Sequence, residues 1–307
     1  MNELIALDPQ SLVDRSPREL ERDLFQINRE FGFEHGRFVA QYPHSYAEHY
    51  WKAFNSISQS NDGFSLSIVK KRLEVFFNDL LPVSAIYDPI STWPENAYVK
   101  NQRLFDAIVT DSSVYEVYTL DELLSGGIEK LQYTGRETKV VATPANYTKI
   151  IRPLILASSE VYIADRYFPF VGTCADNEVD RGIELLSNLI TVAEENQRCK
   201  WIVILSDFAH KESRDWSVEK KDEKVRETIA AVKRKVGKGM TCKLGFDVVK
   251  GRDLIDIHER YVFSMKGCIA FDKGLVCDGK TRKVSYESRP SHELTLNKLR
   301  KYMKRRS

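Results

Sequence analysis

The stretch ASSEVYIADRYF, residues 157–168, decides the fold of the second half of this chain of 307 residues. Its apolar run VYIA has the length and composition of a buried β-strand, and the run ends at Asp165. Downstream, amphipathic segments that predict helices alternate with apolar runs that predict strands. The helices are predicted over residues 181–195 and 218–236, and the strands over residues 200–205 and 242–249. This alternation predicts an α/β domain, with a mixed, mostly parallel sheet and helices on both faces.

The same pattern extends in both directions along the second half. A helix is predicted before the quoted stretch, over residues 146–157. Two strands are predicted after residue 249, over residues 257–263 and 267–271, and a last helix over residues 291–303. In sheets of this kind, ligands bind beyond the carboxyl ends of the strands. Asp165 and the segment SDFAH, residues 206–210, therefore lie where a ligand site is expected; the alternative for this segment is a plain connection between elements.

The first half has a different pattern, which predicts a mainly helical domain. Ser16-Pro17-Arg18-Glu19 has the form of a capping box with proline at the first helical position. Residues 65–81 place apolar side chains at helical spacing. Further helices are predicted over residues 46–57 and 95–105, and residues 31–38 predict a turn or a short hairpin.

The polar segment 126–138 is the predicted boundary between the two halves, and the charge divides there too. Residues 1–137 carry 13 Lys and Arg against 21 Asp and Glu, a net charge of −8. Residues 138–307 carry 33 against 23, a net charge of +10. We therefore expect a helical domain of unknown role over residues 1–137 and an α/β domain over residues 138–307.

The positive charge is concentrated at the end of the chain. Six cations follow one another there without an acidic residue between them: Lys298, Arg300, Lys301, Lys304, Arg305 and Arg306. Such a run is typical of binding to the phosphate groups of DNA or RNA. The alternative is a solvated terminal helix with a basic tail that binds nothing. We call these six residues the basic tail.

Several classes of protein are disfavoured by the composition. The five cysteines are odd in number and contain no CxxC pair, which argues against a disulfide framework and against a zinc site. We expect no metal and no cofactor. No run approaches the roughly 20 apolar residues of a membrane span, and the start MNELIALDPQ does not have the pattern of a signal peptide. A cytoplasmic protein with reduced thiols is the expectation.

Two segments resemble the phospholipase-D-like superfamily. The quoted stretch resembles its first strand, which ends in an aspartate followed by an aromatic residue, and DIHERYVF, residues 256–263, resembles its histidine-bearing strand. The resemblance covers about residues 140–280. It is nearest to the divergent branch found as the C-terminal domain of microtubule-interacting-and-trafficking (MIT) proteins, and to related bacterial domains.

The resemblance implies a site around His258. In active members, the motif is His-x-Lys followed, after four residues, by Asp; the histidine attacks phosphorus and the lysine holds the phosphate oxygens. Here His258 matches, Arg260 takes the place of the lysine, and Met265 takes the place of the aspartate. Arginine still binds phosphate, whereas methionine cannot orient an imidazole. Asp165 then either replaces that carboxylate or pairs with Arg260.

A second copy of the motif supplies the second histidine of the family mechanism, which protonates the leaving oxygen. This chain has one copy, so a site with two histidines requires a homodimer. The leading hypothesis is a nucleic-acid-binding component of a bacterial, phage-defence type of system, with metal-independent phosphodiester cleavage at His258. The alternative is a non-catalytic adaptor or scaffold, which binds a protein partner through residues 1–137 or an anionic membrane through its basic half.

Overall fold

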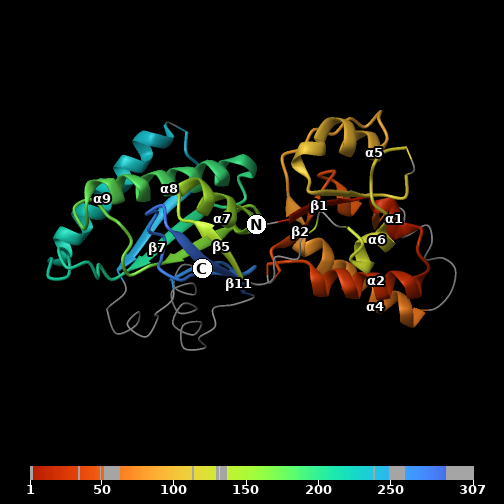
Figure 1. Ribbon diagram of the computed structural model, residues 1–307, viewed down its shortest axis with the longest axis horizontal. Helices are drawn as coiled ribbons and strands as arrows, with labels where there is room; N and C mark the ends of the chain where they lie inside the picture. Colours follow the sequence, from red (N-terminus) through yellow and green to blue (C-terminus); the bar gives the residue numbers. More distant parts are fainter. Residues whose placement is uncertain are drawn as a thin grey trace. The chain divides into compact units, whose positions relative to one another are not determined.

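The computed structural model describes residues 3–33, 35–48, 50–51, 63–112, 114–128, 131, 137–237, 239–248 and 260–287 (Figure 1). The chain forms two compact units, Met1–Gly135 and Arg136–Ser307, and each has its own sheet. His258, the basic tail and the helix over 291–303 lie outside the described residues, and five other predicted segments lie partly outside them: 31–38, 46–57, 126–138, 242–249 and 257–263.

The first unit contains a parallel sheet of four strands in the order β3-β2-β1-β4. Its strands are β1 (Glu3–Leu7), β2 (Arg37–Gln41), β3 (Leu81–Pro82) and β4 (Ala107–Val109). The prediction of a mainly helical first domain was therefore wrong. The strands have five residues or fewer and are buried, so they show no alternation of polar and apolar residues that would distinguish them from helix or loop.

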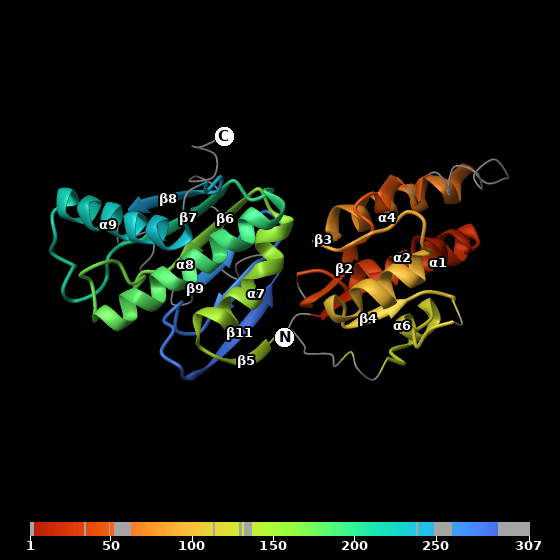
Figure 2. The same ribbon diagram turned by 90° about the horizontal axis from the view of Figure 1, so that it is seen from above.

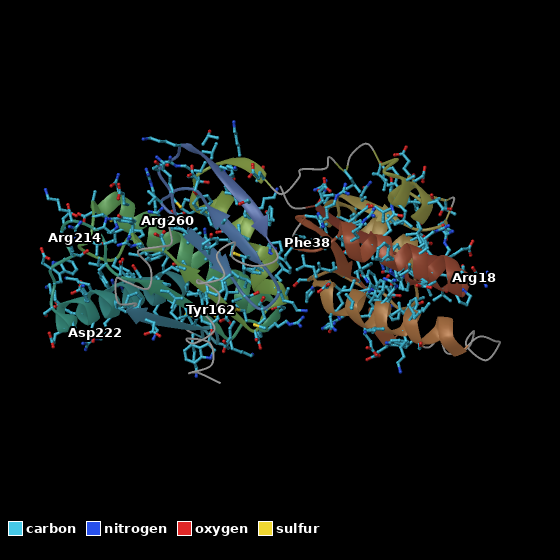
Figure 3. All side chains as sticks on the ribbon, turned by 90° about the horizontal axis from the view of Figure 1, so that it is seen from below. Arg18, Phe38, Tyr162, Arg214, Asp222 and Arg260 are labelled. Atoms are coloured by element: carbon cyan, nitrogen blue, oxygen red, sulfur yellow. The ribbon has the colours of Figure 1, made fainter. Side chains whose placement is uncertain are left out.

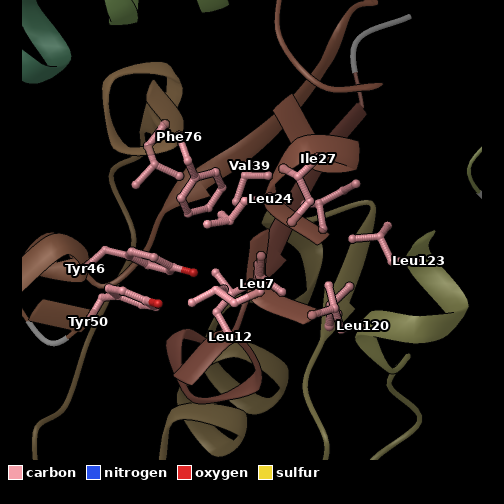
Figure 4. Close-up of a cluster of buried hydrophobic side chains, with 14 of the residues drawn as sticks. Leu7, Leu12, Leu24, Ile27, Val39, Tyr46, Tyr50, Phe76, Leu120 and Leu123 are labelled. Atoms are coloured by element: carbon pink, nitrogen blue, oxygen red, sulfur yellow. The ribbon is translucent and has the colours of Figure 1, made fainter. Parts of the chain in front are cut away.

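Helical segments cover both faces of this sheet. They are α1 (Pro9–Val13), α2 (Pro17–Glu30), α4 (Gly63–Asp79), α5 (Trp93–Glu95), the π-helix η1 (Asn96–Lys100), the 3₁₀-helix η2 (Gln102–Leu104) and α6 (Leu120–Ser125). The predicted capping box is confirmed, because Ser16 and Glu19 each accept from the backbone N–H of the other. Leu24 of α2 and Phe76 of α4 pack with Val39 on one face (Figure 4), and Ala97 and Phe105 pack on the other.

The second unit contains a mixed sheet of seven strands in the order β5-β11-β10-β9-β6-β7-β8. The strands are β5 (Glu137–Val141), β6 (Glu160–Ala164), β7 (Trp201–Ser206), β8 (Lys243–Val248), β9 (Arg260–Phe263), β10 (Cys268–Phe271) and β11 (Thr281–Glu287). Strands β6, β7 and β8 are parallel, and β9 pairs with β6 in the antiparallel direction. The α/β class of this half is confirmed.

The three described helices of the second unit are α7 (Pro144–Ala157), α8 (Asp176–Asn196) and α9 (Val218–Val236). They pack side by side on one face of the sheet (Figures 1 and 2). The prediction of helices on both faces was therefore wrong for the described part of the chain. The connections β5–α7–β6, β6–α8–β7 and β7–α9–β8 all advance in the same direction along the sheet, and right-handed crossovers then place every helix on the same side.

No helix in the described ranges is both long enough and apolar enough to cross a membrane.

Two buried tyrosines in the first unit differ in how their hydroxyl groups are satisfied. Tyr42 is buried, accepts a hydrogen bond from Asn101 Nδ2 at 3.1 Å and donates one to the Ile86 carbonyl at 3.0 Å. Tyr46 is fully buried, and its hydroxyl has no hydrogen-bond partner among the described residues. In Figure 4 this hydroxyl is directed toward the part of the core that holds Leu7 and Leu12. Its burial raises the pKa of Tyr46.

We predict that Tyr46→Phe raises the free energy of unfolding by about 1 kcal/mol, because it removes a buried hydroxyl that lacks a partner. Tyr42→Phe is the matched control, and it should lower the free energy of unfolding by about 2 kcal/mol because two hydrogen bonds are lost. Urea denaturation of the two variants measures both changes. Destabilisation of equal size in both variants would contradict the inference that only the Tyr42 hydroxyl is hydrogen-bonded.

Candidate functional site

Several strand ends of the second unit meet at one edge of its sheet. The carboxyl ends of β6, β7 and β10 lie there, together with the first residue of the antiparallel strand β9. Six polar or aromatic side chains, which we call the carboxyl-edge cluster, are linked to one another there: Asp165, Arg166, Tyr167, Asp207, His210 and Arg260. Figure 3 shows Arg260 on this unit.

Asp165 connects three parts of the sheet. Its side chain is fully buried, and its two oxygens accept hydrogen bonds from the N–H groups of Tyr167 and Leu275, each at 2.9 Å. Arg260 Nε lies 3.8 Å from the Asp165 Oδ1 atom. Burial raises the pKa of the Asp165 carboxyl above its ordinary value of 3.8, although the two N–H groups and Arg260 lower it. Asp165 thus joins the end of β6 to β9 and to the turn that follows β10.

The turn after β10 needs a glycine next to Asp165. Gly274 has a φ of +76°, a conformation that L side chains rarely adopt. A Cβ atom at this position would lie 2.5 Å from Asp165 Oδ2. The close approach of this backbone allows the next residue, Leu275, to donate its N–H to the carboxylate.

Arg166 is held by the loop that follows β7. Its Nε donates to Asp207 Oδ2 at 3.0 Å, and its terminal Nη2 lies 2.9 Å from the same oxygen. The Asp207 side chain is only 7% exposed, whereas that of Arg166 is 24% exposed. The other Asp207 oxygen, Oδ1, is buried without a hydrogen-bond partner in the described part of the chain.

The Tyr167 ring lies near two guanidinium groups. Arg260 Cζ is 5.2 Å and Arg166 Cζ is 5.9 Å from the ring centroid, which is within the range of cation–π contacts. The His210 ring meets the same ring edge-on at 5.5 Å between centroids, and its Nε2 atom lies 2.8 Å from the Tyr167 carbonyl oxygen. If Nε2 carries the proton that this carbonyl accepts, neutral His210 presents Nδ1 as a hydrogen-bond acceptor.

The structure brings together two of the three predicted catalytic residues. Asp165 and Arg260 form the ion pair that was one of the two alternatives for Asp165. Their relation to His258 lies outside the described residues. Met265, which takes the place of the family aspartate, is 83% exposed in the turn between β9 and β10. This turn is at the opposite end of β9 from Arg260, so Met265 has no part in the cluster.

Arg166 was not predicted as a site residue. The sequence signal was its position in the loop that follows a buried strand, two residues after the end of β6 and at the carboxyl edge of the sheet. Among the described residues, no group of three or more His, Cys, Asp or Glu side chains is arranged to hold a metal ion. No protein-family model matches the chain, and no curated protein matches it.

We predict that Gly274→Ala destabilises the protein more than Gly279→Ala. Both glycines have a φ of +76°, but a Cβ atom at Gly279 would meet nothing within 4 Å. Gly279→Ala should therefore cost about 1 kcal/mol for backbone strain alone. Gly274→Ala should cost about 2 kcal/mol more, because Asp165 must move away from its two N–H donors. Urea denaturation measures both values, and equal losses would show that Asp165 is not held as described.

Proposed function

We propose that the second unit binds the phosphodiester backbone of DNA or RNA at the carboxyl-edge cluster, and that the basic tail adds further phosphate contacts. The observation that carries this proposal is the pair of guanidinium groups, Arg166 and Arg260, which lie 5.9 and 5.2 Å from the centroid of the Tyr167 ring. The three groups offer the two kinds of contact that nucleic acids require, charged donors for phosphate and an aromatic face for a base.

The two arginines are oriented before a ligand arrives. Their side chains are 24% and 20% exposed, so both reach solvent from a largely buried base. The contact with Asp207 uses one edge of the Arg166 fork and leaves its other N–H groups for a ligand. Guanidinium groups held in this way bind phosphate oxygens in pairs and lose little conformational entropy on binding.

Attraction over longer distances comes from the rest of this half. Within the cluster, Asp165 and Asp207 offset the charges of Arg260 and Arg166. Residues 138–307 nevertheless carry a net charge of +10, and the six cations of the basic tail supply more than half of that value. Binding should therefore depend steeply on salt, because each phosphate contact releases bound counterions from the nucleic acid.

We predict that Arg166→Gln with Arg260→Gln weakens binding to labelled single-stranded DNA or RNA about tenfold. The slope of log affinity against log salt should fall by about 2, since two phosphate contacts are lost. Fluorescence anisotropy from about 50 to 200 mM salt measures both quantities. Arg152→Gln is the matched control, because Arg152 pairs with Glu195 between α7 and α8 and lies outside the cluster.

Replacement of the six tail cations by Gln should reduce the salt slope by a larger amount. If the wild-type chain does not bind nucleic acid at low salt, or if the double variant behaves like Arg152→Gln, the proposed site is wrong. Binding to vesicles that contain acidic lipid, without binding to nucleic acid, would instead support the membrane adaptor.

Cleavage at His258 extends this proposal and rests on the resemblance to phospholipase-D-like domains. We predict that wild-type protein cleaves single-stranded nucleic acid in the presence of a metal chelator. His258→Ala should lower the rate by at least about 100-fold and leave the affinity unchanged, because the imidazole acts on the reacting phosphorus rather than in binding. Equal cleavage by both proteins would show that His258 does not act in cleavage, and no cleavage by the wild type would leave a binding protein without nuclease activity.

A further inference from the structure

The first unit has an open groove between α2 and α4, far along the chain from the carboxyl-edge cluster. Its volume is about 530 Å³. The residues that line it, which define the α2–α4 groove, are Phe25, Asn28, Arg29, Ile68, Lys71, Arg72 and Val75. All of them belong to the two helices, which pack against each other along their length.

The groove exists because α4 has two apolar stripes. Val69, Leu73 and Phe76 follow helical spacing and are buried in the core. Ile68 directly precedes Val69 and Val75 directly precedes Phe76, so both lie about 100° around the helix axis from the buried stripe. They are two helical turns apart and form the second stripe. This second stripe faces the groove, where no described element covers it.

Two large apolar side chains of the groove are exposed to solvent. Phe25 is 50% exposed and Val75 is 46% exposed, whereas Leu24 and Phe76, which neighbour them in sequence, are buried. Exposed apolar side chains are common singly, but a contiguous set in a groove marks a surface that binds a partner.

The polar residues of the groove are cations or a neutral amide. Arg29 and Lys71 are exposed, and the Arg72 guanidinium lies 4.9 Å from the centroid of the Phe25 ring. Arg72 Nη2 is 3.5 Å from Glu21 Oε1, while its Nε is buried and has no hydrogen-bond partner among the described residues. The groove therefore offers positive charge, although Arg29 Nη2 lies 3.1 Å from Glu30 Oε1 and residues 1–137 carry a net charge of −8.

We propose that the α2–α4 groove binds an amphipathic helix of a partner protein, with apolar side chains on its inner face and Asp or Glu on its flanks. A helix fits because two packed helices present a groove into which a third can pack its side chains. The 14 residues of α2 span about 21 Å, which matches about four turns of a bound helix. Carboxylates on the flanks then reach Arg29, Lys71 and Arg72.

The net charge of this unit favours a protein partner over nucleic acid or an acidic membrane. Those two ligands are polyanions that the net charge of −8 on residues 1–137 repels, whereas a helix presents a few carboxylates at chosen positions. The proposal does not depend on nucleic-acid binding by the second unit, and the residues involved are different.

The experiment uses the full chain to select from a displayed library of random peptides of about 16 residues, which span about 24 Å as helices. The enriched peptides should carry apolar residues at spacings of three, four and seven, with Asp or Glu beside them. Synthetic copies should bind the wild type, and Val75→Asp should weaken them about tenfold. The double variant Arg29→Glu with Lys71→Glu should weaken them by a similar factor and should favour peptides with Lys in place of the acids.

Two control variants separate the groove from general effects. Val114→Asp makes the same change at a valine that is 76% exposed elsewhere in the first unit, and Lys70→Glu reverses an exposed charge on α4 outside the groove. Both should bind the peptides as the wild type does. The proposal is overturned if no enriched peptide depends on Val75, if basic peptides are enriched instead, or if Val75→Asp only converts a homodimer to monomers in sedimentation.

Discussion

The buried carboxylate of Asp165 is the constraint on which the site of the second unit depends. It accepts N–H groups from its own loop and from the turn after β10, and it lies beside Arg260 on β9. A charged group sealed from water is costly unless it is paired, so this set of contacts fixes the strand ends relative to one another. Because Asp165 is fully buried, it can act only by positioning Arg260 and Tyr167, whereas Arg166, His210 and Arg260 are partly exposed.

The sequence predicts the second unit better than the first, for a physical reason. Helix α9 begins and ends at the predicted residues, and the bounds of β6 differ from the prediction by one residue. The prediction succeeds there because long amphipathic helices alternate with strands of five or six residues. Strands β5 and β11 were missed since most of their residues are charged or polar, as expected for antiparallel strands near a sheet edge. In the first unit, short buried strands such as β4 show no alternation of polar and apolar residues that would identify them as strands.

The candidate site was predictable only in part. Ligands bind beyond the carboxyl ends of the strands in such sheets, and this rule places Asp165 and His210 at the same edge from the sequence alone. The resemblance to phospholipase-D-like domains adds Arg260. The partner of Arg166 could not be predicted, because Asp207 lies 41 residues away and the contact depends on the conformation of two loops. The α2–α4 groove escaped prediction for a related reason: Ile68 and Val75 look like core residues until the packing of α4 shows which stripe is buried.

The strand order of the second unit also has a consequence for how the chain folds. Among the described strands, β5 pairs with β11 alone, which joins residues 137–141 to residues 281–285. During synthesis, β5 and α7 leave the ribosome long before their neighbour, so this edge of the sheet stays open until the last described strand arrives. Contacts between such distant residues are slow to form, and the incomplete sheet exposes an unpaired strand in the meantime. Completion of this sheet is therefore expected after translation of β11 rather than progressively from its first strand.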